Sequence, residues 1–206
     1  MEKRDLAVGA AAAVAFLTER AGNRLGAQLT GPGGIQRIPP RTGRRHLLTI
    51  LRAALDRPRV AAGTAEEAPY TLADALRSLR TLPGNGLVAV VSDFLETGWE
   101  QPLRTVAHRH QILAVETVDP RELELPAVGL LTVVDPETGR RREIPTHSRR
   151  LRERYAEAAL EQRALIKASI RRAGAAHLRL RTDRDWVRDV VRHVAEQRRR
   201  SGGGAA

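Results

Sequence analysis

Asp93 is the residue whose type and position most directly suggest chemistry. It follows Ser92 at the end of the run LVAVV, residues 87–91, which shows no polar alternation. Such a run is typical of a strand that is covered on both faces in a parallel sheet. Ligands of these sheets bind beyond the carboxyl ends of the strands. We therefore predict that Asp93 projects into such a crevice, where it could bind a ligand or a metal ion.

Helix capping is the alternative role for an Asp that follows a strand. Thr97 is better placed to cap the next helix, and Glu100, three residues later, can act as its reciprocal partner. The sequence therefore predicts no capping duty for Asp93. A ligand or metal role and a structural role stay equally open.

The other residues that could do chemistry favour structural roles. His108 and His110 stand at an expected helix end without an acid at zinc-ligand spacing, so we predict that they interact with the helix dipole. Asp119 precedes Pro120, a pattern that predicts a turn. Ser92 lacks the Gly-x-Ser-x-Gly setting of a hydrolase nucleophile. The sequence contains no recognisable catalytic set.

Helices and strands are expected to alternate along most of the chain. Apolar periodicity, capping residues and β-branched runs predict helices at 6–22, 44–55, 97–110 and 147–172, and further helices that start at 71 and after residue 185. They predict strands at 23–31, 35–40, 87–91, 112–118 and 177–182. Two capping boxes are predicted, Thr71 with Asp74 and Thr182 with Asp185. A β-hairpin insertion is expected at about 128–145, with turn residues at 135–139. This order predicts an α/β fold with an open, mostly parallel sheet.

Composition limits the class of protein further. The sequence has no cysteine, which favours a reducing cytoplasm, and the apolar stretch 6–17 is too short to cross a bilayer. The net charge of +11 would suit nucleic acid, but arginines and acids alternate and only 3% of residues are aromatic. A solvated surface is the favoured interpretation. We expect one cytoplasmic domain, 1–200, with a flexible tail at 201–206 and no membrane partner.

Several segments together resemble one bacterial family. They are VAVVSDFL, LRTVAHRHQILAVETVDPRELELPAVGLLTVVDPETG, NRLGAQL, IPPRTGRRHLLTIL and LRTDRDW. Their order is similar to that in the domain of unknown function family fifty-eight, which is related to von Willebrand factor type A domains. The resemblance covers most of the chain and implies a Rossmann-like type A fold with flanking helices.

The resemblance also implies a metal-ion-dependent adhesion site. In that site a divalent cation is held by an Asp-x-Ser-x-Ser turn, by a Thr from a second loop and by an Asp after the fourth strand. Asp93 matches the last Asp, Ser92 stands beside it, and Thr42 lies in the stretch that corresponds to the Thr loop. Because no Asp-x-Ser-x-Ser occurs in the sequence, we expect Mg²⁺ to bind only weakly. Ser92, Asp93 and Thr42 are then expected to contact a partner protein.

The family resemblance further implies work beside MoxR-type AAA+ ATPases. We therefore expect a non-enzymatic interaction module, an adaptor whose partner is such an ATPase or its client protein. A nucleic-acid-associated basic protein is the first alternative, and a metal-dependent hydrolase centred on Asp93 is the second.

One strand of the type A fold is expected to be missing. The first strand of that fold is central and carries the Asp-x-Ser-x-Ser turn, and the chain is expected to be a truncated type A-like domain that starts after it. Strands in a sheet lie about 4.8 Å apart, so the gap would leave two apolar edges. We expect strands 25–29 and 87–91 either to pair with each other directly or to borrow a strand through homo-oligomerisation.

Overall fold

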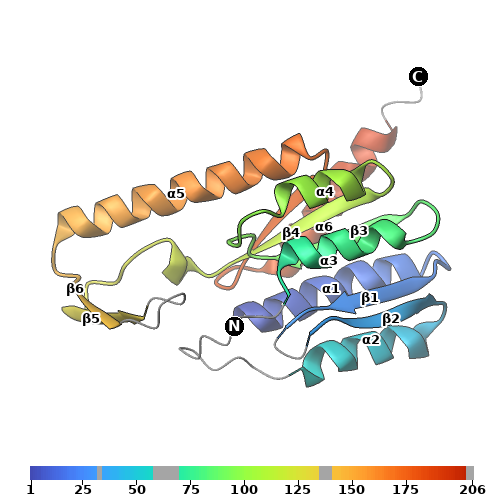
Figure 1. Ribbon diagram of the computed structural model, residues 1–206, viewed down its shortest axis with the longest axis horizontal. Helices are drawn as coiled ribbons and strands as arrows, with labels where there is room; N and C mark the ends of the chain where they lie inside the picture. The colour runs from blue at the N-terminus through green and yellow to red at the C-terminus, as the bar shows by residue number, and fades with distance from the viewer. Residues whose placement is uncertain (32–33, 58–69, 135–140, 203–206) are drawn as a thin grey trace.

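The computed structural model describes residues 1–31, 34–57, 70–134 and 141–202 (Figure 1). Within these residues the helices are α1 (Lys3–Glu19), α2 (Arg44–Asp56), α3 (Leu72–Ser78), α4 (Glu100–Ala107), α5 (Arg149–Arg172) and α6 (Trp186–Gly202). The strands are β1 (Leu25–Leu29), β2 (Gln36–Arg41), β3 (Leu87–Ser92), β4 (Gln111–Val118), β5 (Leu130–Val134), β6 (Arg141–Pro145) and β7 (Ala176–Arg181). The described part of the chain contains no helix with the length and apolarity needed to cross a bilayer.

A three-stranded parallel sheet in the order β3-β4-β7 forms the centre of the fold. The central strand β4 is almost wholly buried, as its apolar run predicts. Helices α1 and α6 cover one face of this sheet, where Leu6 and Val190 pack against Leu178. Helices α3, α4 and α5 cover the other face. The α/β class expected from the sequence is confirmed, and the architecture is compatible with a Rossmann-like fold.

The remaining strands form two small antiparallel sheets. Strands β1 and β2 pair with each other, and β2 contains Pro39 and Pro40, which fit a strand with one free edge. Strands β5 and β6 form the expected hairpin, and its predicted turn lies outside the described residues. Figure 1 shows this hairpin below the start of α5, away from the other sheets.

Strands β1 and β3 belong to different sheets and do not pair in the described residues. Direct pairing, the first of the two expected ways to close the gap, therefore does not occur. Helix α1 packs against both sheets, since it contacts β1 in one and β3, β4 and β7 in the other. The two sheets are thus connected by helix packing instead of a continuous ladder of hydrogen bonds.

Two of the predicted helix caps differ from those in the structure. Helix α4 begins at Glu100 after Trp99 and has no side-chain cap, so Thr97 does not cap it. Before α6, Oδ1 of Asp185 accepts a hydrogen bond from the Arg188 amide at 3.2 Å, so Asp185 itself is the cap. The capping box of Thr71 and Asp74 at the start of α3 is confirmed.

Candidate functional site

The turn after β3 holds Asp93 by local hydrogen bonds. The Ser92 hydroxyl accepts from the Phe94 amide at 3.0 Å, and Asp93 Oδ1 accepts from the Leu95 amide at 3.2 Å. Asp93 therefore stabilises its own turn, and helix α4 has no side-chain cap, so Asp93 does not cap it, as predicted. Short side-chain bonds of this kind are the usual way in which Ser and Asp fix a turn.

Phe94 anchors this turn in the core. Its backbone has φ of 56°, a left-handed conformation that is uncommon outside glycine. The ring is buried and packs edge to face on Trp99, with centroids 5.0 Å apart. The Trp99 indole also donates to the Phe94 carbonyl at 3.3 Å. Aromatic packing thus offsets the strained backbone and fixes the direction in which Asp93 points.

The Lys3 ammonium lies between two carboxylates at this edge of the sheet. It is 2.7 Å from Asp93 Oδ2 and 2.6 Å from Glu122 Oε1. Burial by itself would lower the pKa of Lys3, but hydrogen bonds to Asp93 and Glu122 outweigh it and raise that pKa above its ordinary value. The first turn of α1 thus delivers a permanent positive charge to the end of β3.

A buried ion-pair network continues inward from this edge. Arg163 of α5 contacts Glu122 at 2.8 Å and Glu116 at 3.3 Å, and it donates to the Asp93 carbonyl at 3.0 Å. Glu116, in the central strand, has no exposed surface. We call Lys3, Asp93, Glu116, Glu122 and Arg163, together with His177 and Arg179, the charge network.

His177 and Arg179 of β7 complete the charge network around Glu116. His177 Nε2 and Arg179 Nε lie 2.8 Å and 2.7 Å from Glu116 Oε2. Burial by itself would raise the pKa of Glu116, but these two hydrogen bonds hold it below its ordinary value. The central acid is therefore ionised at neutral pH, and the network links β3, β4, β7, α1 and α5 electrostatically.

The predicted partner residue Thr42 lies away from Asp93. It is exposed in the loop before α2, beside Gly43. The other end of α2 is the one near the site, because Arg4 of α1 donates to the carbonyls of Leu55 and Arg57. A helix of 13 residues is about 20 Å long, so the structure does not bring Thr42 to Asp93.

Thr71 is the threonine that lies near the Asp93 turn. It caps α3, whose first amide, that of Leu72, donates to Glu96 Oε2 at 2.6 Å, three residues after Asp93. Its hydroxyl donates to Asp74 Oδ2 at 2.7 Å. The sequence predicts Thr71 only as a helix cap, because the spacing of the loops does not reveal which loop folds back to β3.

The donor set around Asp93 does not fit a divalent cation. Mg²⁺ requires several oxygen ligands in octahedral geometry. One oxygen of Asp93 faces the Lys3 ammonium and the other accepts an amide proton. No three acidic or histidine side chains in the described ranges are grouped to hold a metal ion. The Lys3 ammonium provides the positive charge here, and weak Mg²⁺ binding stays a prediction.

The other candidate residues have structural contacts. His108 is the C-terminal cap of α4, and Asp119 caps the short 3₁₀ helix Pro120–Glu122, as the turn prediction expects. The Arg121 side chain donates to Asp119 and holds the pKa of that carboxyl below its ordinary value. His110 is buried, and its Nε2 has no hydrogen-bond partner among the described residues.

The structure also identifies site residues that sequence reasoning missed. Lys3, Glu122 and Arg163 lie far from Asp93 in sequence, and no local motif marks them. Glu116 carried the only signal, a lone acid inside the apolar run ILAVETV. A charge within a buried strand must be paired, which predicts cationic neighbours although it does not name them.

The structure thus defines an α/β protein with an acidic turn at the carboxyl end of its parallel sheet. The chain belongs to the family described as "Protein of unknown function DUF58", whose model matches residues 1–165. Uncharacterised proteins of Mycobacterium tuberculosis and Mycobacterium bovis are each 46% identical over 199 residues. That match covers 96% of this chain and 62% of the relatives' length, so the chain spans under two thirds of them.

A shorter relative gives a different coverage. An uncharacterised protein of Mycobacterium avium is 43% identical over 164 residues, which is 79% of this chain and 95% of that protein. No solved structure gives a significant match.

Proposed function

We propose that the chain is a non-enzymatic interaction module that docks a basic group of a partner protein at Asp93. The observation that carries this proposal is the Asp93 carboxylate at the carboxyl end of β3. Its side chain is 33% exposed. Its turn fixes it in place, and Glu122, 30% exposed, presents a second carboxylate through the shared Lys3 contact. Two fixed acids at a sheet end suit a Lys or Arg side chain.

The contacts made within the chain leave room for that group. An ionised carboxylate has about four lone-pair sites. Asp93 uses one oxygen for the Lys3 ammonium and the other for the Leu95 amide, so each oxygen retains acceptor capacity. A partner's cation that binds beside Lys3 would not have to displace it. Closure of the interface would exclude water and strengthen the new ion pair.

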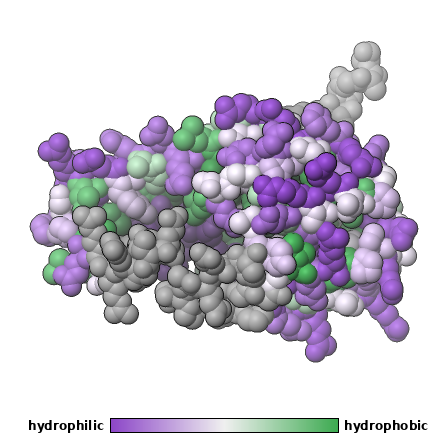
Figure 2. All heavy atoms as spheres, in the orientation of Figure 1, coloured by the Kyte–Doolittle hydropathy of each residue, from purple (hydrophilic) through white to green (hydrophobic). Residues whose placement is uncertain are grey.

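The face of the molecule in Figure 2, apart from the residues drawn in grey, is mostly polar. Figure 2 shows hydrophilic side chains over most of this face, with apolar residues in separate small areas. An interface without a large apolar patch depends on fixed charges and hydrogen bonds for its specificity. The charge network provides such fixed charges.

The partner that we propose is a MoxR-type AAA+ ATPase or its client protein, as the family resemblance implies. In this proposal the chain works as an adaptor during ATP-driven remodelling. The absence of cysteine supports a reducing cytoplasm as its compartment.

Affinity purification from the native organism tests the proposal. The tagged chain is compared with Asp93→Asn, which keeps the shape of the side chain and removes its charge. The matched control is Asp56→Asn, an exposed acid on α2 whose ion-pair partner among the described residues is Arg52 at 3.5 Å. We expect the ATPase or its client to copurify with the wild type and the control but not with Asp93→Asn. Equal recovery with all three proteins would contradict docking at Asp93, and recovery that depends on nucleic acid would favour the basic-protein alternative.

A further inference from the structure

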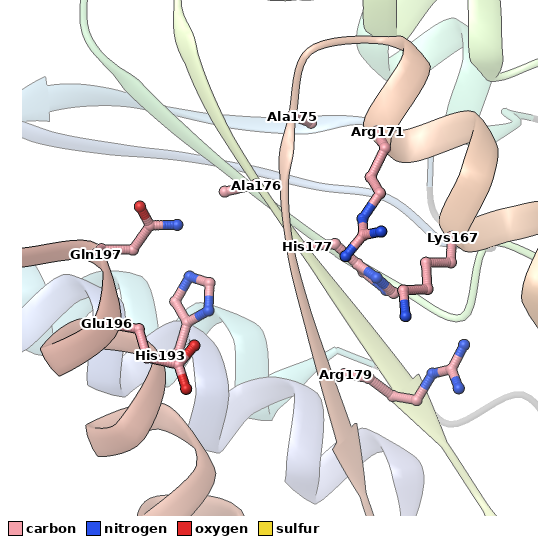
Figure 3. Close-up of a pocket in the computed structure, with 9 residues that line it drawn as sticks. All are labelled: Lys167, Arg171, Ala175, Ala176, His177, Arg179, His193, Glu196 and Gln197. Carbon is pink, nitrogen blue, oxygen red and sulfur yellow. The ribbon is translucent and has the colours of Figure 1, made fainter. Parts of the chain in front are cut away.

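A hollow of about 400 Å³ lies along the outer edge of β7, between α5 and α6 (Figure 3). Ala175, Ala176, His177 and Arg179 line it from the strand side. Lys167 and Arg171 line it from α5, and His193, Glu196 and Gln197 line it from α6. This hollow lies at the edge of the sheet opposite β3, so it is a different surface from the Asp93 turn.

The strand in this hollow has one free edge. In the described part of the chain β7 pairs only with β4. The other edge therefore presents main-chain groups that another strand could pair with. Proteins use such edges to bind extended peptides by adding a strand to the sheet.

Two cations on the α5 side are available to a ligand. Lys167 and Arg171 are four residues apart on one face of α5 and are both exposed. Figure 3 shows both side chains extending from the helix toward β7. Neither side chain forms a hydrogen bond or an ion pair with any residue that the structure describes. Arg179, in contrast, is held by Glu116 at 2.7 Å and by the Arg163 carbonyl at 3.1 Å.

We propose that this hollow binds an extended acidic segment of a partner protein, which pairs with the free edge of β7. Alternate side chains of an added strand point to the same face of the sheet. Acids at alternate positions would therefore meet Lys167 and Arg171 while the main chain pairs with β7. This surface is additional to the proposed docking site at Asp93 and does not depend on it.

The composition of the hollow favours a peptide over nucleic acid. A strand edge recognises a peptide main chain, which nucleic acid lacks. The lining includes no Phe, Tyr or Trp side chain, the large rings on which successive bases of a single strand stack. Glu196 on α6 would also repel a phosphate backbone. In a peptide strand alternate side chains point to opposite faces, so its acids can all face α5 and avoid Glu196.

A synthetic peptide of alternating Glu and Val, labelled with fluorescein, provides the test by fluorescence anisotropy. The test variant carries Lys167→Gln and Arg171→Gln. The matched control carries Arg150→Gln and Arg154→Gln, two exposed arginines with the same spacing on the same helix but outside the hollow. We expect the test variant to bind the peptide about tenfold more weakly and the control to bind within about twofold of wild type. Equal weakening in both variants would overturn the proposal, because it would show a general charge effect.

A second probe tests the strand pairing separately. The same peptide with N-methyl groups on alternate amides, placed on the edge that would face β7, keeps its charges but cannot donate to the strand. We expect its binding to be lost, and equal binding of both peptides would overturn strand addition. A single-stranded oligonucleotide that displaced the peptide at equal concentration would also overturn the proposal. Since no ATPase is used, these results are independent of the docking test at Asp93.

Discussion

Glu116 is the residue on which the charge network depends. It is fully buried in the central strand and receives hydrogen bonds from Arg163, His177 and Arg179. A buried ion pair adds little net stability relative to apolar packing. Removing one member costs much more, because the remaining charges stay buried without compensation. The network is therefore a constraint on geometry, which keeps α5, β7 and the Asp93 turn in one arrangement.

We predict that Glu116→Gln lowers the free energy of unfolding by about 3 kcal/mol. The neutral amide has nearly the same size, but it leaves the guanidinium of Arg163 without its carboxylate partner on β4. Urea denaturation checks the change. The control is Glu153→Gln, an exposed acid that pairs with Arg149 at 2.7 Å on the surface of α5 and should cost less than about 0.5 kcal/mol. Equal losses in the two variants would contradict the prediction, because they would show that neutralising the buried Glu116 costs no more than neutralising an exposed acid.

Acid should weaken the fold through the same residue. The pKa of Glu116 is lower in the folded state than its ordinary value, because hydrogen bonds from His177 and Arg179 outweigh the effect of burial. Its contribution to stability is therefore complete above the ordinary Glu pKa of about 4.3 and is lost as the pH falls through the lower folded value. We expect the urea concentration at the unfolding midpoint to decrease when the pH is lowered below about 4. The decrease should be smaller in Glu116→Gln. A midpoint with the same acid dependence in both proteins would contradict this assignment.

At the level of single residues, the sequence predicts positions better than partners. The end of an apolar run places Asp93 at the edge of the sheet, and the fold agrees. Lys3, which neutralises Asp93, is 90 positions away, and only the packing of α1 brings the two together. The Thr97 cap is wrong because the buried ring of Phe94 and its contact with Trp99 determine how the chain enters α4.

Helix α1 connects the two main sheets of the fold. It packs on the three-stranded sheet, on β1 and on both α2 and α6. Its contact with α6 depends on Gly9, where an added Cβ would lie 2.9 Å from the Trp186 ring. A glycine inside a helix is unfavourable by about 1 kcal/mol relative to alanine, and this close approach explains why it is tolerated here.

We predict that Gly9→Leu lowers the free energy of unfolding by about 2 kcal/mol, despite the better helix propensity of leucine. The new side chain would force Trp186 and α6 away from α1. Gly86→Leu is the control, because a Cβ at Gly86 would meet nothing within 4 Å. Thermal or urea unfolding of the two variants provides the measurement. A Gly9→Leu protein as stable as the control would show that α6 can shift without cost.

Elements with strong local patterns were predictable from the sequence. The run at β3, the capping box at Thr71 and the long amphipathic helix α5 all occur near their predicted bounds. The division into separate sheets was not predictable. Strand pairing depends on contacts between segments far apart in the chain, and the expected neighbours β1 and β3 have no local feature that shows whether they pair.

The edges of the sheets matter for the behaviour of the whole molecule. Strand β3 pairs on one side with β4 and, within the described ranges, has no partner on its other side. Its residues Leu87 and Ala89 are exposed. Natural proteins protect such edges with charges, and neither of these residues is charged.

We predict that the chain self-associates through this edge as its concentration rises, and that Ala89→Lys shifts it toward the monomer. A lysine on an edge strand opposes pairing with a second strand. Sedimentation velocity over a range of concentrations measures the effect. Ala158→Lys, which adds the same charge at an exposed position of α5, is the control. A wild-type protein that stays monomeric at every concentration would contradict edge-mediated association.

The most direct test of the proposed docking site is the affinity of the purified chain for the MoxR-type ATPase, measured by calorimetry with wild type and Asp93→Asn. Removing one charge of an ion pair that becomes buried in an interface costs about 2 kcal/mol or more, so we predict that Asp93→Asn binds at least about tenfold more weakly. Its free energy of unfolding should stay within about 1 kcal/mol of wild type, because the amide oxygen can still accept from Leu95. Equal affinity of the two proteins, with both folded, would contradict the account.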